Sequence, residues 1–168
     1  MAIEHDFFGL IESSPDGSIF WSEMVELGEQ AVTVDLTAPE QDAVSSEALD
    51  VAAELILSLD AVDLRARNAM IAELSDRTSE VIEFLFHVED NYGDDLVDLL
   101  VNPSGDTHVD VIASLVLVSM TVLADAYQAA DGPFVVLEYG LNPDADEQML
   151  LVNLDMVGAV IAVTSADE

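Results

Sequence analysis

Hydrophobic and polar residues alternate with a period of two in the first part of the chain. Over residues 18–37, aromatic and β-branched residues stand on both sides of Leu27-Gly28-Glu29-Gln30, a glycine-containing segment of the right length for a hairpin turn. In the second arm Val32, Val34 and Leu36 alternate with polar residues. The pattern predicts a β-hairpin with one buried face.

The period changes to that of a helix after Pro39. Apolar residues recur at helical spacing over residues 49–59, and Ser45 or Ser46 is available as the N-cap of this helix. A second helix is expected to have Asp60 as its N-cap and to run through Leu64, Met70, Ile71 and Leu74. A third is expected over residues 79–90, ended by Asn91-Tyr92-Gly93, and a short fourth over residues 94–100.

The last third of the chain returns to strand-forming residues. Four strands are expected in runs rich in Val, Leu and Thr, over residues 114–123, 134–141, 149–155 and 159–165. One helical turn that begins at Asp106 or Thr107 could precede the first of these strands. Strands, then helices, then strands predict an α+β fold. We expect a single domain over residues 1–168, in which the N-terminal hairpin and the C-terminal meander form an antiparallel sheet. The central helical block is expected to pack on one face of that sheet.

The charge balance changes this picture of an ordinary domain. The chain of 168 residues has 35 Asp and Glu residues against three Arg and no Lys, so its formal net charge is -32. Such a charge opposes binding to nucleic-acid phosphates and to anionic lipid headgroups. At the same time, 51% of the residues are hydrophobic, which excludes a disordered chain. We therefore expect no nucleic-acid or membrane partner, and a basic protein as the partner.

The residue types that the chain lacks exclude further kinds of site and of cellular location. The chain has no cysteine, which excludes disulfides, thiolate nucleophiles and iron–sulfur clusters. Acidic residues occupy the start of the sequence, where a signal peptide carries Lys or Arg, and no apolar segment follows, so we expect a cytoplasmic location. The longest uncharged stretch, residues 111–124, is shorter than the roughly 20 residues that a helix needs to cross a bilayer.

Five local motifs occur in an order that resembles a known family. They are Phe8-Gly9, the hairpin that contains Trp21, Leu64-Arg65-Ala66-Arg67-Asn68-Ala69, Val81-Ile82-Glu83-Phe84-Leu85-Phe86-His87 and Val135-Val136-Leu137-Glu138-Tyr139. Together they resemble a bacterial family of uncharacterised proteins, the domain of unknown function two thousand and four. The resemblance spans nearly the whole chain. It implies the fold, and it implies no catalytic residue.

One helical stripe contains metal-binding residue types. Glu80, Glu83, His87 and Asp90 follow helical spacing opposite the apolar face of the predicted third helix. Glu83 and His87, one turn apart, could both reach a divalent cation. We interpret the stripe as a solvated acidic face, because a fifth of all residues in the chain are acidic. We therefore expect no cofactor.

Other polar segments favour structural explanations. Asp106, His108 and Asp110 would share one face of an extended segment, but the neighbouring turn residues favour a polar loop that caps a helix. Residues 144–147 lack the spacing of a calcium loop and are expected to form a solvated turn. Arg65 and Arg67 are expected to pair with nearby acids. Trp21 is expected in the core.

Three functions are consistent with these observations. The sequence has no nucleophile elbow and no phosphate-binding loop, and its three histidines are far apart. We therefore favour a non-enzymatic binding protein, like an inhibitor or immunity protein, that uses an acidic surface against a basic protein. The first alternative is an enzyme that depends on carboxylates or a metal. The second is an acidic surface that reflects only adaptation to salt or a genome that avoids lysine codons.

Overall fold

The main element of the fold is a sheet of six strands. The computed structural model describes residues 2–101, 103–126, 133–142 and 148–167. Within them, the strands of the main sheet lie in the order β3-β4-β5-β6-β7-β8, and β1 and β2 form a separate antiparallel pair. The strands are β1 Ala2–His5, β2 Gly9–Glu12, β3 Ile19–Leu27, β4 Gln30–Ala38, β5 Val116–Leu123, β6 Val135–Gly140, β7 Gln148–Leu154 and β8 Val160–Asp167.

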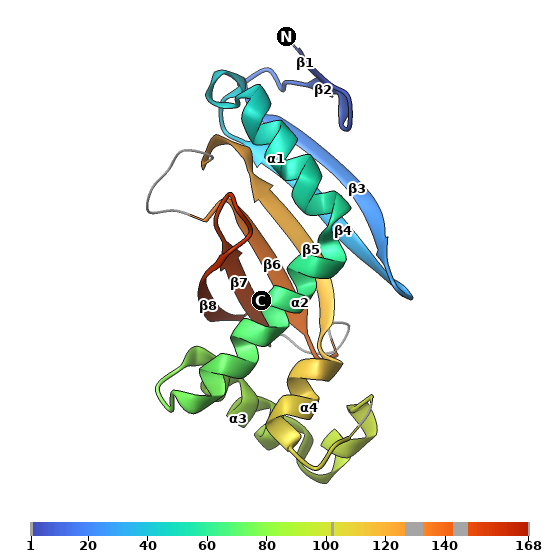
Figure 1. The fold of residues 1–168 in the computed structure, drawn as a ribbon, viewed down its shortest axis with the longest axis vertical. Helices are drawn as coiled ribbons and strands as arrows, with labels where there is room; N and C mark the ends of the chain where they lie inside the picture. Colours follow the sequence, from blue (N-terminus) through green and yellow to red (C-terminus); the bar gives the residue numbers. More distant parts are fainter. Residues whose placement is uncertain (1, 102, 127–132, 143–147, 168) are drawn as a thin grey trace.

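The helices come between β4 and β5 in the chain. Figure 1 shows α1 and α2 crossing the sheet one after the other, with α3 and α4 near one end of it. The α-helices are α1 Ser46–Leu57, α2 Leu59–Ala72, α3 Glu80–Tyr92 and α4 Thr107–Ser114. Short 3-10 helices are η1 Gln41–Ala43, η2 Glu73–Ser75, η3 Gly93–Leu99 and, after β5, η4 Ala124–Ala126.

The predicted hairpin is confirmed as β3 and β4. Leu27 pairs with Gln30 across a turn of two residues, Gly28 and Glu29. Gly28 has a φ of +60°, whereas no residue other than glycine has a positive φ in the described part of the chain. A turn with a positive φ only at its first central residue is of type II′, whose twist matches that of the two strands. Glycine at position 28 therefore sets the register of the hairpin.

One pair of strands differs from the predicted antiparallel sheet. β4 and β5 are parallel, with Val34 opposite Met120 and Leu36 opposite Val122, while every other neighbouring pair in the main sheet is antiparallel. Parallel neighbours need a long crossover connection. The helical block is this crossover, because it carries the chain from the end of β4 back to the start of β5.

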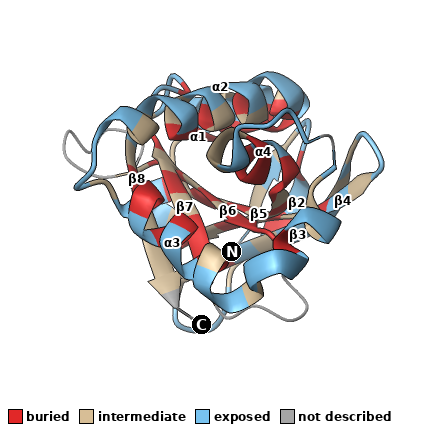
Figure 2. Cartoon of the chain, turned by 90° about the horizontal axis from the view of Figure 1, so that it is seen from below, coloured by how far each residue is buried: buried red, intermediate tan, exposed pale blue. Residues whose placement is uncertain are grey.

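The buried residues of the strands lie on one face of the sheet. Val34, Met120, Leu137 and Val152, from four neighbouring strands, are all fully buried. The buried side chains of the four α-helices join them in one hydrophobic cluster (Figure 2). The residues between them along the strands are mostly half-buried or exposed; Phe20 and Met24 on β3 are each 62% exposed. The helices thus cover one face and leave the other largely open.

The helices agree with the sequence except at their boundaries, in one apolar stripe and at residues 94–100, where the predicted short helix is the 3-10 helix η3. Ser45 caps α1 by accepting a hydrogen bond from the Ala48 N–H at 3.1 Å. α2 begins at Leu59, so Asp60 lies in its first turn and is not its N-cap. Leu64, predicted on the apolar stripe of α2, is 60% exposed, because the stripe that faces the core is formed by Leu59, Val62, Ala66 and Met70.

The last helix is longer than predicted. α4 spans Thr107–Ser114, where the sequence indicated one turn, so β5 starts only at Val116. The α+β fold, with its N-terminal hairpin, central helices and C-terminal meander, is confirmed. None of the helices in the described part of the chain is both long and apolar enough to span a lipid bilayer.

Arg65 joins α2 to the turn between β7 and β8. Its Nη1 atom donates hydrogen bonds to the carbonyl oxygens of Val157 at 3.4 Å and of Gly158 at 3.2 Å. Gly158 has a φ of +81°, and a Cβ atom at this position would lie 2.6 Å from Arg65 Nη1 and 3.1 Å from Leu55 Cδ2. Glycine is therefore required here both by the backbone conformation and by the close approach of Arg65.

We expect Gly158→Ala to lower the free energy of unfolding by more than Gly17→Ala does. Both glycines have similar positive φ angles, +81° and +89°, but an added Cβ at Gly17 meets nothing within 4 Å. Gly17→Ala should therefore cost about 1–2 kcal/mol from backbone strain alone, and Gly158→Ala should cost more because it also displaces Arg65. Urea unfolding of both variants measures the difference. Equal losses would show that Arg65 does not hold the turn.

Candidate functional site

The acidic stripe that was considered for metal binding lies on the outer face of α3, as expected for a solvated face. Glu80, Glu83, His87 and Asp90 are all exposed, as their spacing indicates. Glu80 accepts a hydrogen bond from the Ser165 N–H of β8 at 3.4 Å. Among the described residues, no group of three or more His, Asp and Glu side chains is placed to hold a metal ion. The structure therefore brings no third ligand to Glu83 and His87.

The segment from Asp106 to Asp110 builds the start of α4. Asp106 is the N-cap and accepts a hydrogen bond from the Val109 N–H at 3.3 Å. Asp110 is buried, and its carboxylate accepts hydrogen bonds from the Ser104 hydroxyl at 2.6 Å, the Ser104 N–H at 2.7 Å and the Gly105 N–H at 3.3 Å. The Ser104 hydroxyl in particular lowers the pKa of Asp110 below its ordinary value. Asp110 thus fixes the loop before α4, and sequence analysis did not predict its burial.

His108 pairs with a glutamate that lies far away in the sequence. Its Nε2 atom lies 2.8 Å from Oε1 of Glu89 on α3, and both residues line a surface pocket of about 410 Å³ with Gly105, Asp106 and Thr107. A nucleophile would have to donate its proton to His108. The nearby Ser104 hydroxyl donates instead to Asp110. The His108–Glu89 pair therefore links α3 to α4, and Ser104 is not activated by it.

His5 makes a similar link at the other end of the molecule. Its Nε2 atom lies 2.8 Å from Asp50 Oδ1 on α1, and its Nδ1 atom accepts a hydrogen bond from the Phe7 N–H at 3.1 Å. The ring also packs near Phe8, which stands edge-on to Trp21 at 4.7 Å between ring centroids. Trp21 is only partly buried and packs against the core from its margin, so its expected place in the core is confirmed only in part.

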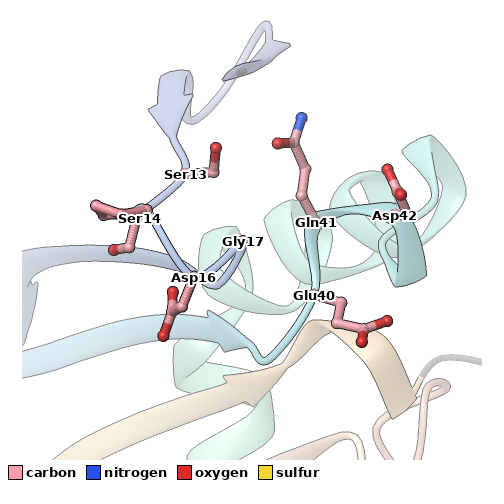
Figure 3. A pocket seen from close by; sticks show the side chains of 8 residues that line it. Ser13, Ser14, Asp16, Gly17, Glu40, Gln41 and Asp42 are labelled. Carbon is pink, nitrogen blue, oxygen red and sulfur yellow. The ribbon is translucent and has the colours of Figure 1, made fainter.

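One surface pocket is formed by two polar loops. It has a volume of about 640 Å³ and is lined by residues 13–17 and 40–42. Figure 3 shows that the carboxylates of Asp16, Glu40 and Asp42 do not converge on one point. The Ser18 hydroxyl, which donates to Asp16 at 2.7 Å, lowers the pKa of that carboxyl. Asp16 thus stabilises its own turn, and the three carboxylates form no common binding site.

Arg67 is the centre of a polar network between α2, α4 and β6. Its Nε atom lies 3.1 Å from both carboxylate oxygens of Asp63, and its Nη1 and Nη2 atoms donate to the carbonyl oxygens of Ile112 and Leu115, each at 2.8 Å. The guanidinium also stacks on the ring of Tyr139, 5.2 Å from its centroid. Carbonyls at the C-terminal end of a helix have no partner within the helix, and a cation there also interacts favourably with the helix dipole.

Tyr139 completes this network. Its hydroxyl donates to Asp63 at 2.7 Å. Burial raises the pKa of Tyr139 well above its usual value, and the Asp63 carboxylate adds to this effect, so the hydroxyl stays a donor. The expected pairing with a nearby acid is therefore confirmed for Arg67, whereas it is wrong for Arg65, which binds backbone carbonyls of the β7–β8 turn instead. The contacts of Arg67 to α4 and those of Arg65 to the β7–β8 turn were not predicted.

A further pocket lies beside the free edge of β3, and we call it the edge pocket. It has a volume of about 530 Å³ and lies between the end of the β3–β4 hairpin and the junction of α1 and α2. It combines apolar side chains, several of them exposed, with carboxylates. It is lined by Phe7, Met24, Val25, Glu26, Leu27, Gly28, Ile56, Leu57, Leu59 and Asp60.

Comparisons with protein-family models, curated proteins and solved structures found no match to this chain. The resemblance to the domain of unknown function two thousand and four therefore stays a prediction. Residues 144–147, considered as a calcium loop, lie outside the described residues. The features of this protein that bear on its function are its acidic surface and the edge pocket.

We expect Arg67→Lys to lower the free energy of unfolding by about 2–3 kcal/mol. Lysine keeps the charge, but its single ammonium group cannot bind the Asp63 carboxylate and two carbonyls of α4 at the same time. Arg77→Lys is the matched control, because Arg77 is exposed on the loop before α3. Urea unfolding measures both variants. Equal stability of the two would contradict a structural role of the guanidinium.

We expect the effect of Asp110→Asn to depend on pH. A carboxyl whose pKa is lowered by folding stabilises the protein above its unfolded pKa, and this contribution is lost as the pH falls through the folded pKa. D110N should therefore be less stable than the wild-type protein near pH 7, and the gap should narrow as the pH falls below the ordinary value of 3.8.

Urea unfolding at several pH values measures this gap, and Asp98→Asn, which removes an exposed carboxylate, controls for the lost charge. A gap that stays constant with pH would contradict the assignment of the hydrogen bonds to the ionised carboxylate.

Proposed function

We propose that this protein is a cytoplasmic binding protein, and not an enzyme, that uses its acidic surface against a basic protein partner. The observation that supports this most directly is the use of the arginines. Arg65 binds backbone carbonyls, and Arg67 binds backbone carbonyls and the carboxylate of Asp63, all within the fold. In the described part of the chain, Asp63–Arg67 is the one ion pair between an acid and an arginine. The negative electrostatic field of the surface carboxylates is therefore not neutralised by these two arginines.

An uncompensated field of this sign favours association with cationic surfaces. Opposite potentials steer two proteins together and raise the association rate, and salt weakens the effect. Inhibitors and immunity proteins that cover a nucleic-acid-binding cleft need such a surface, since the cleft is basic. The formal charge of -32 makes this kind of partner the one that the electrostatics favour.

We expect added salt to have opposite effects on folding and on binding. Raising NaCl from about 0.01 M to about 0.15 M shortens the Debye length from about 30 Å to about 8 Å. Repulsion between carboxylates across the domain is then screened, so the Tm should rise. Binding of poly-L-lysine, measured by titration calorimetry over the same range, should weaken. Poly-L-glutamate is the control and should not bind.

A Tm that stays flat or falls with added NaCl would contradict the proposal, because it would mean that the carboxylates are locally compensated. Binding of poly-L-lysine that does not change with salt would contradict it as well. If the other proteins of the source organism are equally acidic, the charge reflects adaptation to its environment and the argument for a basic partner is lost.

A further inference from the structure

The two edges of the main sheet differ in how they are covered. At the β8 edge, Glu80 of α3 accepts a hydrogen bond from the Ser165 N–H, and α3 packs along β8. At the β3 edge, the described residues provide one isolated bridge, between Ser13 and Ile19. Figure 1 shows β3 as the outermost strand of the sheet. The β3 edge is therefore the one that can accept another strand.

The direction of the backbone groups on β3 follows from its turn. Leu27 and Gln30 flank a two-residue hairpin turn and therefore form a hydrogen-bonded pair. Because these pairs alternate along antiparallel strands, every second residue back from Leu27 bonds to β4. The backbone N–H and C=O groups of Ser22, Met24 and Glu26 thus point away from β4. They form a row of donors and acceptors for an added strand.

Apolar side chains lie on both sides of this row. Val25 and Leu27 project toward the core side, where the edge pocket is bounded by Leu57, which is 74% exposed. On the open face, Phe20 and Met24 are each 62% exposed. A strand laid along β3 would place alternate side chains in the edge pocket and on the open face. The edge thus offers apolar contacts as well as hydrogen bonds.

The charges along the edge select one kind of occupant. Glu23 and Glu26 on β3, Glu29 in the turn and Asp60 in the edge pocket are exposed, and no arginine lines the pocket. A second copy of the chain, paired through the same strand, would bring these glutamates against those of its partner. Like charges on adjacent strands destabilise a sheet. The charge pattern thus opposes self-association and favours a cationic segment.

We propose that the β3 edge binds an extended segment of the partner as an additional strand, in which Lys or Arg alternates with apolar residues. This inference rests on the function proposed above and names the recognition mode and the chemistry of the partner. The backbone groups of β3 would supply affinity, the edge pocket would hold the apolar side chains, and Glu26, on the open face of β3 together with Met24, would face the cations.

A synthetic peptide of about nine residues, the length of β3, tests the proposal. The probe has Lys at odd and Val or Leu at even positions, with blocked termini. The first control peptide has the same composition with its lysines in one block. The second carries N-methyl groups on alternate amides, which removes backbone donors and keeps the charge. Fluorescence anisotropy gives the Kd, and the probe should bind about tenfold more tightly than either control.

The matched protein variants change the edge without changing the charge. Met24→Pro removes an N–H that points away from β4, so it blocks the added strand and keeps the β3–β4 ladder. It should weaken probe binding about tenfold more than Met24→Ala does, because Met24→Ala removes the same side chain but keeps the N–H. Leu57→Ala, at an exposed position, should weaken binding about fivefold with the stability retained. Circular dichroism verifies that each variant is folded.

The outcomes distinguish failure of the strand-docking mode from failure of the proposed function. Equal binding of all three peptides to the wild-type protein, or equal binding of the probe to M24P, would overturn the strand-docking mode and leave the acidic surface as a diffuse binding site. If no basic peptide binds the wild-type protein even at low salt, the proposed function fails as well. A dimer in sedimentation that M24P abolishes would show a second copy on this edge and would overturn the proposal.

Discussion

The burial of one face of the main sheet is the constraint on which the rest of the structure depends. Val34, Met120, Leu137 and Val152 come from both halves of the sheet, and the helical block covers them together. The crossover from β4 to β5 carries this block, which is why these two strands are parallel and all other neighbours antiparallel. The same arrangement leaves β3 at the edge and one face open, so the core and the proposed binding edge have a common origin.

The scarcity of cations is the second determinant. Arg67 and Arg65 serve places where backbone carbonyls need donors, at the end of α4 and at the β7–β8 turn. His108 and His5 complete the links between elements, each with a single carboxylate. With two of the three arginines used inside the fold, the exposed carboxylates repel one another, and the folded protein carries a negative electrostatic field that a cationic partner can relieve.

Local patterns predicted most of the elements but few of their contacts. Alternation identified the β3–β4 hairpin, and helical spacing identified the inward face of α3, because these signals depend on neighbours in sequence. The exposure of Leu64 and the contacts of Arg67, which reach Tyr139 on β6, depend on elements far away in the sequence, and no local pattern carries that information. The burial of Asp110 depends on how the preceding loop folds around its carboxylate. The exposure of Glu83 and His87 was predictable, since it follows from the face of one helix.

The central claim is that the surface charge is not compensated, and free-solution electrophoresis tests it most directly. The mobility of the folded protein near pH 7 and about 0.01 M salt gives its effective charge. We expect an effective charge that keeps most of the formal charge of -32, after the usual correction for counter-ions, and that is unchanged when micromolar divalent cations are added. A small effective charge, or one that collapses when those cations are added, would show specifically bound cations and contradict the account.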